Sequence, residues 1–138
     1  MKKVYCLDAC AFIAYLDDEV GADVVTDLIQ KADDDKIVLL MHKLNFLEVF
    51  YHTNRKHGKN KATLIFNAIN TYPIELVSDL SDDIFLEAGR LKSKYKLSLA
   101  DSIGLAYSTK SKACFVTSDK HEIKIIAQNE KLKVLWVR

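Results

Sequence analysis

The sequence predicts an α/β fold built around a mostly parallel β-sheet. Short apolar runs alternate along the chain with longer segments of helical periodicity, a pattern typical of strands joined by crossover helices. The 138 residues are 49% apolar and 28% charged, which is ordinary globular composition. Only 4 glycines and 1 proline are present, so a β-sandwich with many turns is disfavoured. Because no linker or repeat divides the sequence, we expect a single domain over residues 1–138.

Five short apolar runs predict strands, and we expect a central sheet of about four to five strands. The first ends at Asp8, and each of the others is long enough for a buried strand but too short for a helix that crosses a domain. The runs are VYCL at 4–7, IVLLM at 37–41, IELV at 74–77, ACFV at 113–116 and KVLWV at 133–137.

Seven segments between and after these runs predict helices. The second is amphipathic, with apolar side chains at helical spacing and charged side chains between them. Gly58 separates the third from the fourth, and Pro73 ends the fourth because a residue before proline avoids the helical region. Ser81 provides an N-cap for the fifth, with two aspartates in its first turn. The segments are about 9–16, 22–32, 44–55, 61–71, 81–95, 99–109 and 121–129.

The charge balance excludes attraction of nucleic acid by the molecule as a whole. Lysine and arginine number 20 against 19 aspartates and glutamates, giving a formal net charge of +1. A nucleic-acid partner would therefore require a local basic patch or a metal ion. The longest apolar run, 9–16, is far shorter than the ~20 residues of a membrane helix. Asp8 also interrupts the apolar stretch that a signal peptide would need, so we expect a cytoplasmic protein without a membrane partner.

We expect the three cysteines, Cys6, Cys10 and Cys114, to be buried free thiols. Their number is odd, and none forms a CxxC pair that would indicate zinc or redox chemistry. A chain of this length can also bury a sufficient core without disulfides.

Four acidic residues lie among apolar neighbours, where an uncompensated charge is costly. Two of them, Asp8 and Asp119, directly follow predicted parallel strands, at the sheet edge where ligand sites gather. The four are Asp8 in VYCLDACAFI, Glu48 in LNFLEVFY, Asp101 in LSLADSIGLA and Asp119 in CFVTSDKH. The remaining acids, including the run at 17–19, are expected to form a solvated surface.

If the four acids converge, they predict a metal site. Each pair of carboxylates ~4 Å apart costs about 4 kcal/mol at an effective dielectric of 20, and a divalent cation or protonation would relieve this repulsion. Oxygen ligands favour Mg²⁺ or Mn²⁺ over zinc. Taken singly, each acid has a structural alternative, either a helix cap or an ion pair. The alternative is strongest for Asp119, because Thr-Ser-Asp before a helix is a good N-cap.

The four segments together resemble the PIN-domain nucleases, in particular the small VapC-type toxins. VYCLDACAFIAYL resembles the opening strand, acid and helix of the family, and LNFLEVFY its helical glutamate. LSLADSIGLAY and VTSD resemble the third and fourth acidic segments, at family-like spacings of 40, 53 and 18 residues. The sequence departs from the family at Ala9, where Thr or Ser is common, with Cys10 next.

This resemblance implies a three-layer α/β/α fold and a Mg²⁺- or Mn²⁺-dependent endoribonuclease. Asp8, Glu48, Asp101 and Asp119 would be the metal-binding and catalytic residues, and the Thr117 hydroxyl would support them. The resemblance also implies a toxin that pairs into homodimers and is held inactive by a cognate antitoxin, whose tail lies across the active-site groove.

The densest basic cluster predicts where an RNA backbone would bind. It lies between the third and fourth predicted helices and consists of Arg55, Lys56, Lys59 and Lys61, with His57 among them. A solvated turn is the structural alternative. Lys120 and His121 flank Asp119 and are further candidates for phosphate contact.

Three other functions remain open on the sequence alone. A PIN nuclease of housekeeping RNA processing would carry the same residues, and a PIN-fold binding module could keep the fold without the chemistry. A phosphoacceptor receiver domain would need an acidic pair at the first strand end, where Asp8 stands alone. A nucleotide-binding Rossmann or P-loop protein is disfavoured because neither GxGxxG nor GxxxxGK[ST] occurs.

Overall fold

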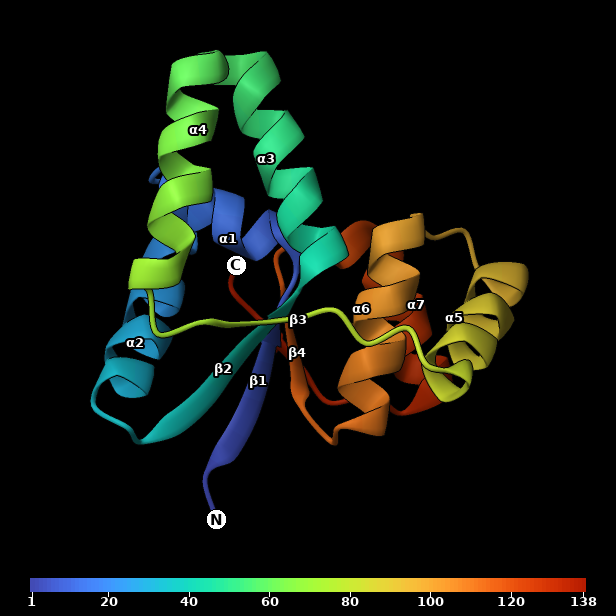
Figure 1. Cartoon of the computed structure of the whole chain (residues 1–138). Coiled ribbons are helices and arrows are strands. Elements are labelled where there is room, and N and C mark those ends of the chain that lie inside the picture. Colours follow the sequence, from blue (N-terminus) through green and yellow to red (C-terminus); the bar gives the residue numbers. More distant parts are fainter.

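The computed structural model describes residues 1–138 and contains one five-stranded, all-parallel sheet (Figure 1). The strands are arranged β3-β2-β1-β4-β5, so the first strand of the sequence is central. They are β1 (Lys3–Leu7), β2 (Ile37–His42), β3 (Glu75–Val77), β4 (Cys114–Thr117) and β5 (Val134–Trp136). The predicted α/β class and parallel sheet are confirmed, with five strands rather than four.

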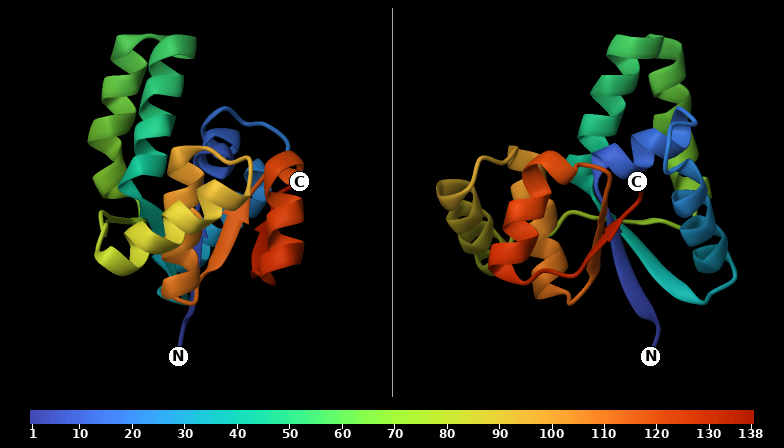
Figure 2. Two further views of the ribbon diagram at one scale, coloured as in Figure 1. Left: turned by 90° about the vertical axis from the view of Figure 1, so that its right-hand side faces the viewer. Right: turned by 180° about the vertical axis from the view of Figure 1, so that it is seen from behind.

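Helices cover both faces of this sheet and complete the predicted three layers (Figures 1 and 2). α1 to α4 lie on one face, while α5 to α7 lie on the other. Their bounds are α1 (Ala9–Leu16), α2 (Ala22–Asp33), α3 (Lys43–His57), α4 (Lys59–Ala68), α5 (Asp82–Lys94), α6 (Leu99–Lys110) and α7 (Lys120–Glu130). No helix combines the length and apolarity that crossing a membrane requires.

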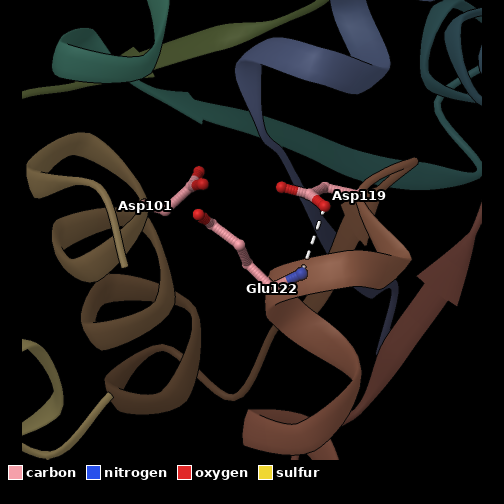
Figure 3. Close-up of side chains that lie close together, drawn as sticks. All are labelled: Asp101, Asp119 and Glu122. Carbon is pink, nitrogen blue, oxygen red and sulfur yellow. Dashed lines mark hydrogen bonds between the residues drawn. The ribbon is translucent and has the colours of Figure 1, made fainter. Parts of the chain in front are cut away.

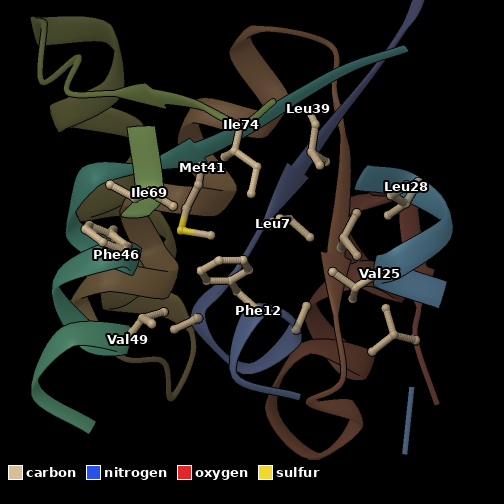
Figure 4. Packing of buried hydrophobic residues seen from close by; sticks show 14 of the residues in the cluster. Leu7, Phe12, Val25, Leu28, Leu39, Met41, Phe46, Val49, Ile69 and Ile74 are labelled. Atoms are coloured by element: carbon tan, nitrogen blue, oxygen red, sulfur yellow. The ribbon is translucent and has the colours of Figure 1, made fainter. Parts of the chain in front are cut away.

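The strands separate two apolar cores because neighbouring side chains point to opposite faces. Leu7 of β1 is paired in register with Met41 of β2 and Val116 of β4, and all three are buried under α1 to α4. Phe12 from α1 fills the centre of this core (Figure 4). On the other face, Phe115 packs with residues of α5, α6 and α7. Burial on both faces explains why the strands appear in the sequence as continuous apolar runs.

The direction in which successive strands are added to the sheet reverses between β1 and β4. After β1 the chain builds outward through α1 and α2 to β2 and then β3, whereas after β4 it builds the other way through α7 to β5. The helices that follow β1 and β4 therefore lie on opposite faces. In open α/β sheets, the carboxyl ends of two such strands form a crevice where ligands bind.

The hairpin of α3 and α4 extends beyond the carboxyl ends of the strands (Figures 1 and 2). Its turn is a single residue, Gly58, whose φ of 93° favours glycine, so α4 begins two residues before the predicted position 61. The predicted end at 71 is a short 3-10 helix, Ile69–Thr71. At the base of the hairpin, the His42 ring accepts a hydrogen bond from the Leu44 amide and starts α3 directly at the end of β2.

One prediction about surface acids is wrong. Asp17, expected to be solvated, has a side chain only 13% exposed, and it accepts hydrogen bonds from Lys56 Nζ and His57 Nε2, both at 3.1 Å. These contacts join the end of α1 to the end of α3. This contact could not be foreseen from local sequence patterns, because the residues involved are about 40 positions apart.

Candidate active site

Asp8 and Asp119 stand at the two strand ends that border the crevice. Asp8 is fully buried, and its amide donates to the Val116 carbonyl oxygen at 2.9 Å, which holds it against the end of β4. Its Oδ1 accepts from the Ala11 amide at 2.8 Å and caps α1. Its Oδ2 is buried without a hydrogen-bond partner. A buried carboxylate oxygen in this state is costly unless a ligand satisfies it.

Asp119 caps the start of α7 through one carboxylate oxygen, as Asp8 caps α1. Its Oδ1 accepts from the amides of His121 and Glu122, at 3.1 and 3.2 Å. The structural alternative foreseen from the sequence, an N-cap, is therefore real, but the cap occupies one oxygen. The second oxygen is available to a ligand, so capping and metal binding are compatible.

Asp101 and Glu48 reach the same crevice from helices of opposite faces. Asp101 is the third residue of α6 and is 8% exposed, and its amide donates to the Ser98 hydroxyl, the N-cap of that helix. Glu48 lies one and a half turns into α3, and its Oε1 is buried without a partner. The helices contact each other through Asn45, whose Nδ2 donates to the Ala100 carbonyl oxygen at 3.4 Å.

Glu122 is a fifth acid at this site that the sequence prediction missed. One carboxylate oxygen each of Asp101, Asp119 and Glu122 lies within 4.8 Å of the others (Figure 3). The signal was available, because residues three apart on a helix share a face and Glu122 follows Asp119 by three. Glu122 lies in a polar segment, so it lacks the apolar neighbours that distinguish the other four acids in the sequence.

Burial, and then neighbouring carboxylates, raise the pKa values of three of the five acids, Asp8, Asp101 and Glu48. Burial raises the pKa of Asp8 well above its usual range, and the charge of Asp101 raises it further. Burial and then Glu48, Asp119 and Glu122 raise the pKa of Asp101 to about 7. Glu48 has a raised pKa for the same reasons, burial first and Glu122 second. The four predicted acids therefore converge, in a site that disfavours their simultaneous ionisation.

Thr117 lies where it can support two of these acids. It is fully buried at the end of β4, and its hydroxyl oxygen accepts a hydrogen bond from the Asp119 amide at 3.0 Å. The Thr117 side chain also opposes the rise in the pKa of Asp8. It therefore acts on the acids at both strand ends.

Comparison with known families decides what kind of domain this is. The pattern of the PIN domain matches residues 5–128, which include every acid of the site. The chain belongs to the PIN-domain family. No curated protein sequence is similar enough to count as a match.

Solved structures of toxin–antitoxin proteins share the fold of this PIN domain. VapBC2 from Rickettsia felis bound to a promoter DNA fragment has a TM-score of 0.74 at 15% identity, covering 96% of this chain and 97% of that one. DNA-bound VapBC from Salmonella typhimurium has a TM-score of 0.72 at 10% identity over the whole of both chains. VapC20 of Mycobacterium tuberculosis, a toxin that cleaves the sarcin–ricin loop, has a TM-score of 0.60 at 14% identity, covering 85% and 91%.

Basic side chains of the PIN domain lie in two places, one beside the acids and one more distant from them. Lys120, His121 and Arg138 line a pocket of about 410 Å³ with Asp119. The predicted RNA-binding cluster lies further away, at the tip of the α3–α4 hairpin (Figure 1). Within it Lys59 and Lys61 are exposed and form no ion pair, whereas Lys56 is already held by Asp17.

Cys10 lies among the acids of the site. In the sequence it follows Ala9, the residue that departs from the family pattern. The pKa of its thiol is raised to about 12, first by partial desolvation of the thiol and then by Asp8, Asp101, Asp119 and Glu48. The thiol is therefore neutral at physiological pH. All three cysteines are free, as predicted, but the expected burial is wrong for two of them, because only Cys6 is buried, Cys114 is half-buried and Cys10 is exposed.

Proposed function

We propose that this PIN domain, residues 1–138, is a Mg²⁺- or Mn²⁺-dependent endoribonuclease and the toxin of a toxin–antitoxin pair. The observation that carries the proposal is the convergence of five carboxylates at the β1–β4 crevice, two of them with a buried oxygen that has no protein partner. Family membership and the fold shared with VapC toxins support the same activity.

The residues present fit a hard divalent cation. The donors are all carboxylate oxygens, which suit Mg²⁺ and Mn²⁺. The unpartnered oxygens of Asp8 and Glu48 and the close set of Asp101, Asp119 and Glu122 offer more ligands than one such ion needs from a protein. Bound there, the cation would supply a water of lowered pKa and neutralise charge that develops on a phosphodiester.

The protein's own contribution to cleavage is positional. Asp8 and Asp119 are each fixed through Oδ1 at a helix N-terminus, so their free oxygens need no reorganisation to bind. The Thr117 hydroxyl fixes the turn that carries Asp119, because it accepts a hydrogen bond from the Asp119 amide. Glu48 and Asp101 approach from opposite layers, and the ring of carboxylates excludes an RNA phosphate until a cation neutralises it. Exposed lysines at the hairpin tip, Lys59 and Lys61, would then hold the RNA backbone.

The test of the activity compares RNA cleavage by the native chain, Asp8→Asn and Asp101→Asn with Mn²⁺ or Mg²⁺. We expect both variants to lose most of the cleavage, and a chelator to abolish it. Asp33→Asn, an exposed acid without an ion pair, is the matched control and should cleave normally. Equal cleavage by all four proteins would identify a contaminating nuclease.

A second test separates a toxin from a housekeeping nuclease. Induced expression of the native chain should arrest growth, expression of Asp101→Asn should not, and co-expression of the antitoxin partner should restore growth. Growth unaffected by an active enzyme would favour the housekeeping function, and growth arrest without any cleavage would favour the binding module. We also propose that the protein is cytoplasmic and that it forms a homodimer. Light scattering of the purified chain would test the dimer.

A further inference from the structure

A second pocket, of about 340 Å³, lies between α1 and α3 beside the acids. It shares Cys10, Ser118 and Arg138 with the pocket at Asp119, and Glu48 forms part of its wall. Its volume lies within the range of small-molecule and nucleotide sites. None of the residues predicted to bind RNA lines it, so the hairpin tip does not account for it.

Arg138 is the only lysine or arginine that lines this pocket. Its position is set by Val137, which is 3% exposed and whose amide donates to the Thr117 carbonyl oxygen at 3.0 Å. Gly21, whose φ is 100°, packs directly against Val137. A Cβ at Gly21 would lie only 2.6 Å from the Val137 carbonyl oxygen. Arg138 itself is exposed and forms no ion pair. A fixed backbone therefore presents a free cation at the edge of the acidic crevice.

Tyr51 provides an aromatic surface on the opposite wall. It lies three residues after Glu48 on α3, which places both side chains on one face of the helix. The residue is 41% exposed, and the Arg55 guanidinium carbon lies over its ring, 5.1 Å from the centroid. Tyr51 also borders an apolar pocket with Leu47 and Leu99, so it separates the two hollows beside Glu48.

We propose that the pocket between α1 and α3 binds the nucleotide next to the cleaved bond, with Tyr51 stacking on its base and Arg138 contacting its phosphate. Every base has a face that can stack on an aromatic ring, and an arginine fork suits a phosphate. This inference rests on the proposed RNA-cleaving function and adds a subsite to it.

The acids in the pocket wall are consistent with this orientation of the nucleotide, with its phosphate at Arg138 and its base at Tyr51. Glu48 belongs to the carboxylates that a bound cation would neutralise, whereas Glu19 would remain charged. The phosphate should therefore lie on the Arg138 side, near Ser118. Glu19→Gln should tighten RNA binding slightly, because it removes an uncompensated negative charge from the pocket.

The experiment measures binding of a short fluorescent single-stranded RNA by anisotropy, with Mg²⁺, in the native background, and the RNA has phosphorothioate linkages that resist cleavage. Tyr51→Leu should weaken binding about tenfold, while Tyr51→Phe, which keeps the ring, should bind like the parent. Arg138→Gln should weaken binding and lower the slope of log Kd against log salt by about 0.7, the value for one lost contact with a single strand. Lys110→Gln removes an exposed, unpaired charge at the far end of α6 and is the matched control.

A parallel kinetic series in the native background should show KM raised by Tyr51→Leu and Arg138→Gln with little change in kcat. If both variants instead match Lys110→Gln in affinity, salt slope and KM while Asp101→Asn abolishes cleavage, the nucleotide subsite is refuted and the nuclease stands. If the chain neither binds nor cleaves RNA with any metal, both proposals fail.

Discussion

The Asn45 amide occupies the space in which a side chain on Gly104 would lie. A Cβ on Gly104 would be 2.6 Å from Asn45 Nδ2 and 3.3 Å from a ring carbon of Phe115. Asn45 lies three residues before Glu48, and Gly104 three residues after Asp101. The close contact between α3 and α6 is thus the point at which acids from opposite layers are brought together.

Gly104→Ala should therefore destabilise the fold despite the better helix propensity of alanine. Overpacking costs typically ~1–3 kcal/mol, and the helix propensity returns only about 1 kcal/mol, so we expect a net loss of about 1 kcal/mol in the free energy of unfolding. Urea denaturation measures it.

A double-mutant cycle with Asn45→Ala isolates the contact. In that background, Gly104→Ala should cost much less or become stabilising, because the amide it displaces is gone. Equal costs in the two backgrounds would place the strain elsewhere, for example at Phe115.

The metal-free protein should lose stability as pH rises from about 4 to about 7. The folded pKa values of Asp8 and Asp101 are raised, to about 7 for Asp101, whereas an unfolded aspartate titrates near 3.9. In this window the folded chain binds more protons than the unfolded chain, so stability falls with pH, by up to ~1.4 kcal/mol per pH unit for each such group. Urea denaturation in a chelator, at about pH 5 and about pH 8, measures the difference.

Asp101→Asn is the diagnostic variant for this effect. It removes one titrating group, so it should be less sensitive to pH and more stable than the native chain at about pH 8. A native chain that is more stable at the higher pH would show that the carboxylates are not crowded in solution.

Divalent ions should raise the melting temperature of the native chain. A ligand that binds only the folded state stabilises it by about 2.7 kcal/mol at 100 times its Kd. The shift should disappear in Asp8→Asn and Asp101→Asn and persist in Asp33→Asn, measured by thermal melting with increasing Mn²⁺. A shift of the same size in all four proteins would point to a metal site elsewhere.

Glu122→Gln tests the acid found only in the structure. Its oxygen is part of the close set with Asp101 and Asp119, so we expect Mn²⁺ affinity to fall by about tenfold or more. Glutamine keeps the size of the side chain, and the Glu122 amide can still donate to Asp119. Unchanged affinity and cleavage would restrict the functional set to the four acids predicted from the sequence.

Asp17→Asn should loosen the base of the hairpin. Burial raises the pKa of Asp17, but hydrogen bonds from Lys56 and His57 outweigh it and the pKa is lowered. The stability that these contacts provide is present above about pH 4 and is lost as pH falls through the folded pKa. We expect a cost of about 1 kcal/mol at neutral pH and none under strong acid, measured by denaturation. A cost independent of pH would mean that packing, not charge, joins α1 to α3.

The helices and strands could be located from the sequence because local signals and burial agreed. VYCL and ACFV are buried on both faces and appear as continuous apolar runs, and Gly58 and Pro73 mark the ends of helical segments. Boundaries differed by one to three residues where a cap decided them, as at His42, whose ring starts α3 earlier than the apolar pattern indicates. Asp8 and Asp119 could be placed together because parallel strands end at one edge of the sheet.

The sequence by itself determined the fold class, the family and four of the acids, since these depend on local pattern and spacing. Only the tertiary structure placed Glu122 close to Asp101, paired Asp17 with Lys56, and brought Arg138 and Tyr51 to the walls of one pocket. Each of these relationships joins polar or charged side chains of different elements. No periodic burial marks such residues, so their partners are decided only when the layers pack.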